Sequence, residues 1–180
     1  MHLSKAFPND PKPLLIPISQ NEVQSAIKKL KNGKAAGLDG IAAELIKFGP
    51  PELAVMLADL LNMSVERNED LGLGVGMLTT LSKPGKPVGP VENIRPIILL
   101  PLLRKILSLI VLDRMRTPIN SYLSSSQSAY RSGRSTADII WAHRWLIAKT
   151  LKYKVVIHIL GLDMSRAFDT IDRSKLLTIL

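Results

Sequence analysis

The chain has 180 residues, of which 46% are hydrophobic, and this suits one compact domain or a piece of a larger one. It contains no Cys, which excludes disulfides, thiol nucleophiles and cysteine-ligated zinc. The net charge is +9, with 10 Lys and Arg against 9 Asp and Glu in residues 1–90 and 14 against 6 in residues 91–180. Such a basic half suits a polyphosphate such as nucleic acid; a solvated basic surface is the alternative.

No segment has the character of a membrane anchor or a secretion signal. The apolar runs Pro96–Leu103 and Val155–Leu160 are too short to span a bilayer. Residues Met1–Phe7 lack the continuous apolar core of a signal peptide. We therefore expect an intracellular protein, in the nucleus or the cytoplasm, with no membrane partner.

The first part of the chain is predicted to be helical. Residues 1–18 contain four prolines and are predicted to form an irregular leader. Ser19 and Glu22 have the spacing of a capping box and start a helix that Asn32-Gly33 ends. Asp39 is predicted to cap a second helix that runs to Phe48, and a third extends from Pro51 to about Arg67.

Strands and helices alternate in the second part. After a glycine-rich loop at 71–76, we expect strands at 77–81 and 94–99, joined by a turn-rich stretch at 82–90. The predicted elements that follow are a helix at 102–115, a polar loop at 124–135, a helix at 136–149, a buried strand at 155–162 and a helix at 173–180 that Asp172 caps. The sequence therefore predicts a mixed α/β fold.

Asp163 follows the predicted buried strand, and Phe168 comes five residues later. A carboxylate at the end of such a strand can hold Mg²⁺, while an aromatic ring beside it can form a flat wall against a sugar. The alternative is structural: Asp163 caps a turn and Phe168 is a core residue.

Two other segments carry cations in stiff surroundings. Lys83 and Lys86 lie in a stretch rich in Pro and Gly, and Arg95 precedes Pro96, which favours an extended backbone. Two strands joined by this basic tip could fold onto a triphosphate, whereas a solvated hairpin is the plainer interpretation. The loop Gln127–Thr136 combines Tyr130 with two arginines, a pattern that can follow a phosphodiester backbone and stack on a base.

Five motifs occur in order and together resemble the reverse transcriptase domain of non-LTR retrotransposons, over roughly residues 19–180. They are Gly33–Ile41, Leu81–Lys86, Ile94–Leu100, Gln127–Thr136 and Leu162–Arg173. The resemblance implies an incomplete right-hand polymerase fold, with the fingers at about 19–150 and the start of the palm at about 151–180. It also implies RNA-directed DNA polymerase activity, a nucleotidyltransferase reaction, in the full-length parent.

The resemblance implies a role for several residues. Asp163 matches the first catalytic carboxylate, and the Met164 carbonyl matches a second metal contact. Lys83, Arg95 and Phe168 match the residues that hold the incoming nucleotide. Nucleic-acid contacts correspond to Gly37, Ile41, Gln127, Arg131 and Arg134. The implied partners are an RNA template, a DNA primer and deoxynucleoside triphosphates, with two Mg²⁺ ions as cofactor.

One departure limits this interpretation. The family's remaining carboxylates come from an aromatic-x-Asp-Asp motif, and the 180 residues contain no Asp-Asp pair. One aspartate is too few to hold two cations that repel each other, so we expect a fragment that is inactive alone. The alternatives are a non-catalytic nucleic-acid-binding module and an unfolded retroelement relic.

Overall fold

The computed structural model describes residues 16–164, 167, 168 and 170–179. Residues 1–15, most of the predicted leader, and Asp169 lie outside the described residues. The chain forms two compact units, one reaching Arg116 and one running from Thr117 onward. Each unit is described separately.

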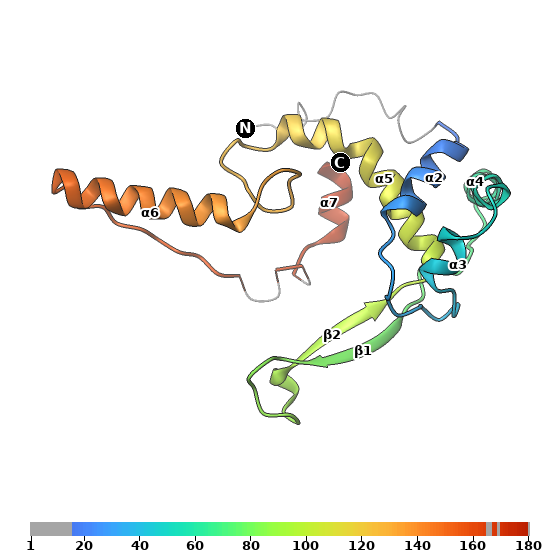
Figure 1. Cartoon of the computed structure of the whole chain (residues 1–180), viewed down its shortest axis with the longest axis horizontal. Coiled ribbons are helices and arrows are strands. Elements are labelled where there is room, and N and C mark those ends of the chain that lie inside the picture. Colours follow the sequence, from blue (N-terminus) through green and yellow to red (C-terminus); the bar gives the residue numbers. More distant parts are fainter. Residues whose placement is uncertain (1–15, 165–166, 169, 180) are drawn as a thin grey trace. The chain divides into compact units, whose positions relative to one another are not determined.

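The first unit contains four α-helices and a β-hairpin (Figure 1). Its elements, in chain order, are α2 (Gln20–Lys29), α3 (Ala43–Lys47), α4 (Glu52–Arg67), β1 (Met77–Ser82), a short 3-10 helix (Val91–Asn93), β2 (Ile94–Leu99) and most of α5 (Leu102–Tyr122), which continues into the second unit from Thr117. The helix predicted at 51–67 and the two predicted strands are confirmed, with bounds within one residue. Helix α5 runs seven residues beyond its predicted end and contains Pro118, which lacks the N–H of a normal helical hydrogen bond.

Helix α2 starts at the predicted capping box. The Ser19 N–H donates to Glu22 Oε2 at 2.9 Å, and the Glu22 N–H donates to Ser19 Oγ at 3.4 Å. Two N–H groups that the helix leaves unpaired are thereby satisfied, which fixes the start of α2. Residues on one face of α2 then face the core at helical spacing.

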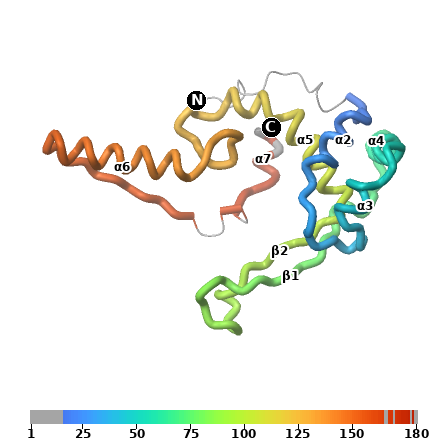
Figure 2. Tube along the Cα trace, in the orientation of Figure 1, coloured from blue at the N-terminus to red at the C-terminus, as the bar shows by residue number. Residues whose placement is uncertain are grey.

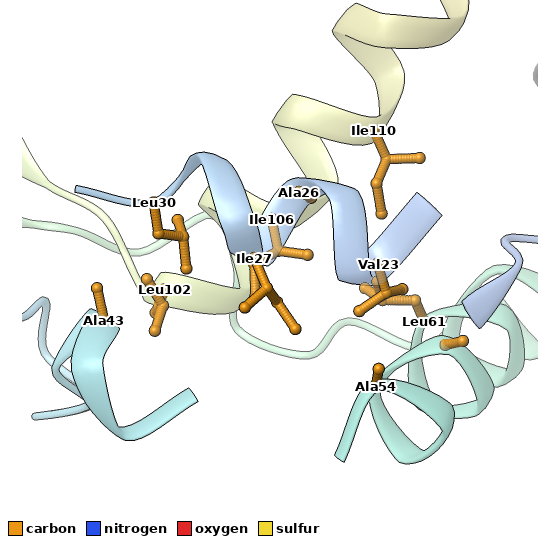
Figure 3. Close-up of a cluster of buried hydrophobic side chains, with 11 residues drawn as sticks. Val23, Ala26, Ile27, Leu30, Ala43, Ala54, Leu61, Leu102, Ile106 and Ile110 are labelled. Carbon is orange, nitrogen blue, oxygen red and sulfur yellow. The ribbon is translucent and has the colours of Figure 1, made fainter. Parts of the chain in front are cut away.

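The core of the first unit lies between α2, α4 and the first half of α5, with Ala43 of α3 at its edge (Figure 3). Val23, Leu61 and Ile106 have between 0% and 1% of their surfaces exposed. Ala54 and Ala58 let the backbone of α4 approach closely, because their side chains are small. The other buried members are Ala26, Ile27, Leu30, Ala43, Leu102 and Ile110.

The two strands form an antiparallel hairpin in which Met77 pairs with Leu99 and Ser82 with Ile94. They are the only sheet among the described residues, and many of their apolar side chains are exposed, including Leu78 at 66% and Ile98 at 62%. The hairpin therefore projects from the helical core rather than forming part of it.

The second unit contains α6 (Thr136–Tyr153) and α7 (Arg173–Ile179). A capping box at Ser135 and Asp138 starts α6, and Asp172 Oδ1 accepts hydrogen bonds from the N–H groups of Ser174 and Lys175 at the start of α7. The predicted polar loop at 124–135 and the Asp172 cap are both confirmed.

Two sequence predictions are wrong. The stretch 155–162 is neither a strand nor buried, and Figure 2 shows it as an extended trace between α6 and α7. A strand needs a hydrogen-bonded neighbour, and no described residue pairs with this stretch. Asp39 does not cap α3, which starts after Ala42 without a side-chain cap. Its Oδ2 accepts instead from the N–H of Leu102, at 2.9 Å, where α5 begins.

The described residues therefore confirm a mixed helix-and-strand fold. Within this part of the chain, no helix combines the length and the apolar character that crossing a membrane requires.

We predict that Glu22→Gln lowers the free energy of unfolding at pH 7 by about 1–2 kcal/mol, because the carboxylate is partly screened by solvent. Arg114 donates to both carboxylate oxygens, at 2.6 and 2.9 Å. This guanidinium holds the pKa of Glu22 at about 2, below its ordinary value of 4.5. A depressed pKa gives stability that is complete above pH 4.5 and is lost as the pH falls toward 2.

Urea unfolding across this pH range checks the prediction. Gln at this position can still form the capping box, so the substitution removes mainly the charge. Glu66→Gln, on the exposed side of α4, is the matched control and should change little. An acid-induced loss of stability that is equal in Glu22→Gln and in the unmodified chain would contradict the prediction.

Candidate nucleotide and nucleic-acid contact sites

The hairpin presents Lys83 and Arg95 on one face. Arg95 pairs with Leu81, and Lys83 follows two residues later, where its N–H donates to the Asn93 carbonyl at 2.7 Å. Side chains alternate between the faces of a strand, and this alternation, carried one residue past the end of β1, puts Lys83 on the same face as Leu81 and Arg95. The register thus brings together two cations that are twelve residues apart in sequence.

The two cations differ in their local partners. Lys83 Nζ donates to the Glu92 carbonyl at 2.5 Å, which holds the side chain beside the turn. An ammonium group has three donor hydrogens, so two remain for another acceptor. Arg95 is exposed and makes no side-chain hydrogen bond or ion pair with the described residues. Its planar guanidinium is therefore available for a bidentate contact with a phosphate.

Gly37 lies where β2 passes into α5. A Cβ at this position would be 2.6 Å from the Leu100 carbonyl oxygen and 2.9 Å from the Pro101 nitrogen. Only glycine allows the two backbones to approach this closely. Ile41, 38% exposed, follows a turn in which the Gly40 N–H donates to the Gly37 carbonyl at 3.1 Å. The first motif therefore lies directly against the end of the strand that carries Arg95.

The loop at 124–135 is held by local hydrogen bonds. The Gln127 N–H donates to the Ser124 carbonyl at 3.1 Å, and Arg131 Nη1 donates to the same oxygen at 2.7 Å. Arg131 therefore helps to shape the loop, with further guanidinium donors left over. Arg134 is exposed, and its side chain makes no hydrogen bond or ion pair with the part of the chain that the structure describes.

Tyr130 and Phe168 bring two of the sequence motifs into contact. Their ring centroids are 6.1 Å apart and their planes meet at 84°, which is the edge-to-face arrangement that aromatic pairs prefer. Tyr130 has a φ of 57°, a conformation uncommon for a residue with a side chain. The sequence indicated an aromatic residue in this loop but not its partner, because the contact depends on tertiary structure.

Asp163 and Met164 are exposed, and Met164 has 73% of its surface accessible. The Asp163 carboxylate makes no hydrogen bond or ion pair with the described residues. Among these residues, no three His, Asp or Glu side chains are close enough together to hold a metal ion. Asp163 is therefore the one candidate metal ligand of the sequence motifs whose carboxylate the structure describes, and the chain contains no Asp-Asp pair.

The candidate residues fall into two groups. Lys83, Arg95, Gly37 and Ile41 lie in the first unit, where the hairpin and the start of α5 place them. The second unit contains the loop residues Gln127, Arg131 and Arg134 together with Asp163, Met164 and Phe168. Each group combines segments that the sequence motifs had indicated separately.

No family model matches the chain, but it is similar to proteins of mobile elements. It is 26% identical to the transposon TX1 uncharacterized 149 kDa protein of Xenopus laevis. The aligned region of 162 residues covers 89% of this chain and 12% of that protein. It is 27% identical to the probable RNA-directed DNA polymerase from transposon BS of Drosophila melanogaster, in an alignment that covers 86% of this chain and 17% of that protein. The RNA-directed DNA polymerase from mobile element jockey of Drosophila funebris is 26% identical, also covering 86% and 17%.

The relatives are proteins of mobile elements, and two of the three are named as RNA-directed DNA polymerases. More particularly, the chain is similar along most of its length to non-LTR retrotransposon proteins, and the resemblance inferred from the five motifs is confirmed. The chain spans only 12–18% of the length of these relatives.

We predict that Gly37→Ala lowers the free energy of unfolding by about 1–3 kcal/mol, because the new methyl group would overlap the backbone at Leu100 and Pro101. Urea unfolding measures the change. Gly74→Ala is the matched control, since a Cβ there meets nothing within 4 Å and no positive φ is required. Equal stabilities for the two variants would contradict the close packing at Gly37.

Proposed function

We propose that this chain is part of an RNA-directed DNA polymerase, the part that holds the incoming nucleotide and supplies the first catalytic aspartate. The similarity to RNA-directed DNA polymerases over about 86% of the chain carries the proposal. The geometry of the hairpin supports it, because Lys83 and Arg95 share one face. Without that register, two basic residues in separate motifs would be weak support for a triphosphate site.

In this proposal, Lys83 and Arg95 bind the triphosphate of a deoxynucleotide. Arg95 offers a bidentate fork and Lys83 a compact charge, two contacts that differ in geometry and complement each other. By the resemblance, Phe168 of the second unit is the residue that favours nucleotides lacking a 2′-hydroxyl. Contact with the Tyr130 ring limits the positions open to Phe168.

The nucleic-acid contacts of the proposal come from both units. Gly37 and Ile41 approach the template strand in the first unit. Gln127, Arg131 and Arg134 approach the RNA template and the DNA primer in the second. Arg134, exposed and without a partner among the described residues, is the best placed of these for a phosphate contact.

By the resemblance, catalysis also needs the carboxylates of an aromatic-x-Asp-Asp motif. Asp163 and the Met164 carbonyl would contribute to a Mg²⁺ site, but the chain contains no Asp-Asp pair to complete it. We therefore propose that these residues act within a longer polymerase and do not transfer nucleotides alone.

A second candidate function is nucleic-acid binding without catalysis. It is favoured by the charge of residues 91–180, where 14 Lys and Arg stand against 6 Asp and Glu. Ion pairs within the chain do not neutralise all of this charge, because several of these cations make no ion pair with a described acid. Arg95 and Arg134 are among them. Binding of this kind releases counterions and weakens steeply as salt is raised.

We predict that the 180-residue chain does not extend a primer on an RNA template with Mg²⁺. The incomplete carboxylate set is the physical reason. A primer-extension assay with labelled deoxynucleotides checks this, with Asp163→Ala as the control for contaminating polymerase. Extension by the unmodified chain that Asp163→Ala abolishes would contradict the proposal of inactivity.

We predict salt-dependent RNA binding that survives Asp163→Ala. Arg134→Ala should weaken it and reduce the slope of log affinity against log salt by about one, the value for one phosphate contact. Arg131→Ala should weaken it further, because the loop also loses its bond to the Ser124 carbonyl. Fluorescence anisotropy of a labelled RNA measures all four proteins. Undetectable binding near physiological salt would exclude the binding function.

A further inference from the structure

Helix α6 has two distinct exposed faces. At about 100° per residue, the side chains at positions 141, 145, 149, 152 and 153 fall within about 120° of one another. They are Trp141, Trp145, Lys149, Lys152 and Tyr153, and we call this the aromatic-basic face. Asp138 and Ala142 fall within the same arc, while the aliphatic residues Ile140, Ile147 and Leu151 lie on the opposite side of the helix. The helix therefore has an aliphatic side that is separate from the aromatic-basic face.

The aromatic-basic face is organised by cation–π contacts. Lys149 Nζ lies 5.3 Å from the centroid of the Trp145 ring and 5.7 Å from that of Tyr153. Lys152 Nζ lies 5.4 Å from the Tyr153 centroid. These contacts hold each ammonium group beside an aromatic ring along the helix. Flat rings and positive charges alternate as a result.

The rings remain accessible even with the lysines beside them. Trp141 is 67% exposed, Trp145 is 51% exposed and Tyr153 is 59% exposed. Trp141 has no cation over its ring among the described residues, so its flat surface is open to a stacking partner. One helical step of four residues advances about 6 Å, which allows neighbouring rings to receive different bases of an extended strand.

The charge around this face is mainly positive. Residues 139–162 contain Arg144, Lys149, Lys152 and Lys154 and no Asp or Glu. Asp138 lies on the face by the same helical spacing, and it accepts a hydrogen bond from the Ser135 N–H at 2.7 Å as part of the capping box. None of the four cations forms an ion pair with an acid that the structure describes. The complementary partner is therefore a polyanion.

We propose that the aromatic-basic face of α6 binds single-stranded nucleic acid, with unpaired bases stacked on Trp141 and Trp145 and phosphates held by Lys149 and Lys152. Exposed rings interleaved with cations are the combination that binds single strands without a sequence requirement. A duplex has no free base faces to offer these rings. This site is additional to the template contact proposed for the loop residues Gln127, Arg131 and Arg134.

The chain provides an unusually specific probe of this face. It contains two tryptophans, and both are on the aromatic-basic face of α6. Tryptophan fluorescence therefore reports on this face alone. A single-stranded oligonucleotide of about 12 nucleotides should quench the emission, and the same sequence as a duplex should quench it much less.

Affinity is measured separately by anisotropy of the labelled oligonucleotide. Lys149→Gln with Lys152→Gln should weaken single-strand binding at least about fivefold. It should also reduce the slope of log affinity against log salt by about two, the value for two phosphate contacts. Trp141→Leu should weaken it about fivefold or more through lost stacking. Leucine and glutamine are good helix formers, and circular dichroism confirms that each variant remains folded. Lys28→Gln with Lys31→Gln, two exposed lysines near the end of α2, removes the same two charges as the lysine double variant; it is the control and should have no effect.

Arg134→Ala separates the two nucleic-acid sites. At a saturating concentration of single strand, this variant should retain the tryptophan quenching, because the rings of α6 are unchanged. The proposal is overturned if the single strand causes no quenching, or if the α6 variants bind it as tightly as the control variant Lys28→Gln with Lys31→Gln does. It is also overturned if the tryptophan emission changes only through self-association of the chain, which would make this face a protein interface.

Discussion

The burial of Val23, Leu61 and Ile106 against one another is the contact on which the first unit depends. These side chains come from α2, α4 and α5, and they are almost fully removed from solvent. Each buried aliphatic residue of this size contributes about 1.5–3 kcal/mol relative to its exposed state. Because Ile106 lies only one helical turn from Leu102, the core fixes the start of α5. Asp39 accepts a hydrogen bond from the Leu102 N–H, and Gly37 packs against the backbone at Leu100 and Pro101. The start of α5 therefore positions the first motif, Gly33–Ile41. The hairpin that carries Arg95 enters the same junction.

The second unit is organised by a different principle. None of its described residues is buried. Most of the interactions that shape these residues join positions close to one another in the sequence: two helix caps, the turn at Ser124 and the lysine contacts of α6. The contact between Tyr130 and Phe168 spans a longer distance in the sequence, since it joins two motifs 38 residues apart. Large apolar side chains such as Trp141 and Leu160 consequently remain exposed. A unit of this kind presents its functional residues on the surface, where their partners must provide much of the environment.

The sequence predicted those elements whose determinants are local. Ser19 and Ser135 start helices because a carboxylate three residues later completes each capping box, and both strands of the hairpin are bounded by glycine, proline or polar residues. Two predictions that depended on a residue distant in the sequence were wrong. Asp39 contacts a helix start 63 residues away, which no local pattern indicates. The stretch 155–162 has the composition of a buried strand but has no neighbour to pair with among the described residues. At the candidate sites, the residue types were predictable, whereas the shared face of Lys83 and Arg95 and the Tyr130–Phe168 contact came from the structure.

The central claim is that these residues belong to a larger polymerase whose other catalytic carboxylates lie outside them. The most direct test is to sequence the transcript on both sides of the codons for this chain. The account predicts an open frame that continues beyond codon 180 and encodes an aromatic-x-Asp-Asp motif. A stop codon directly after codon 180 in several independent copies would contradict it.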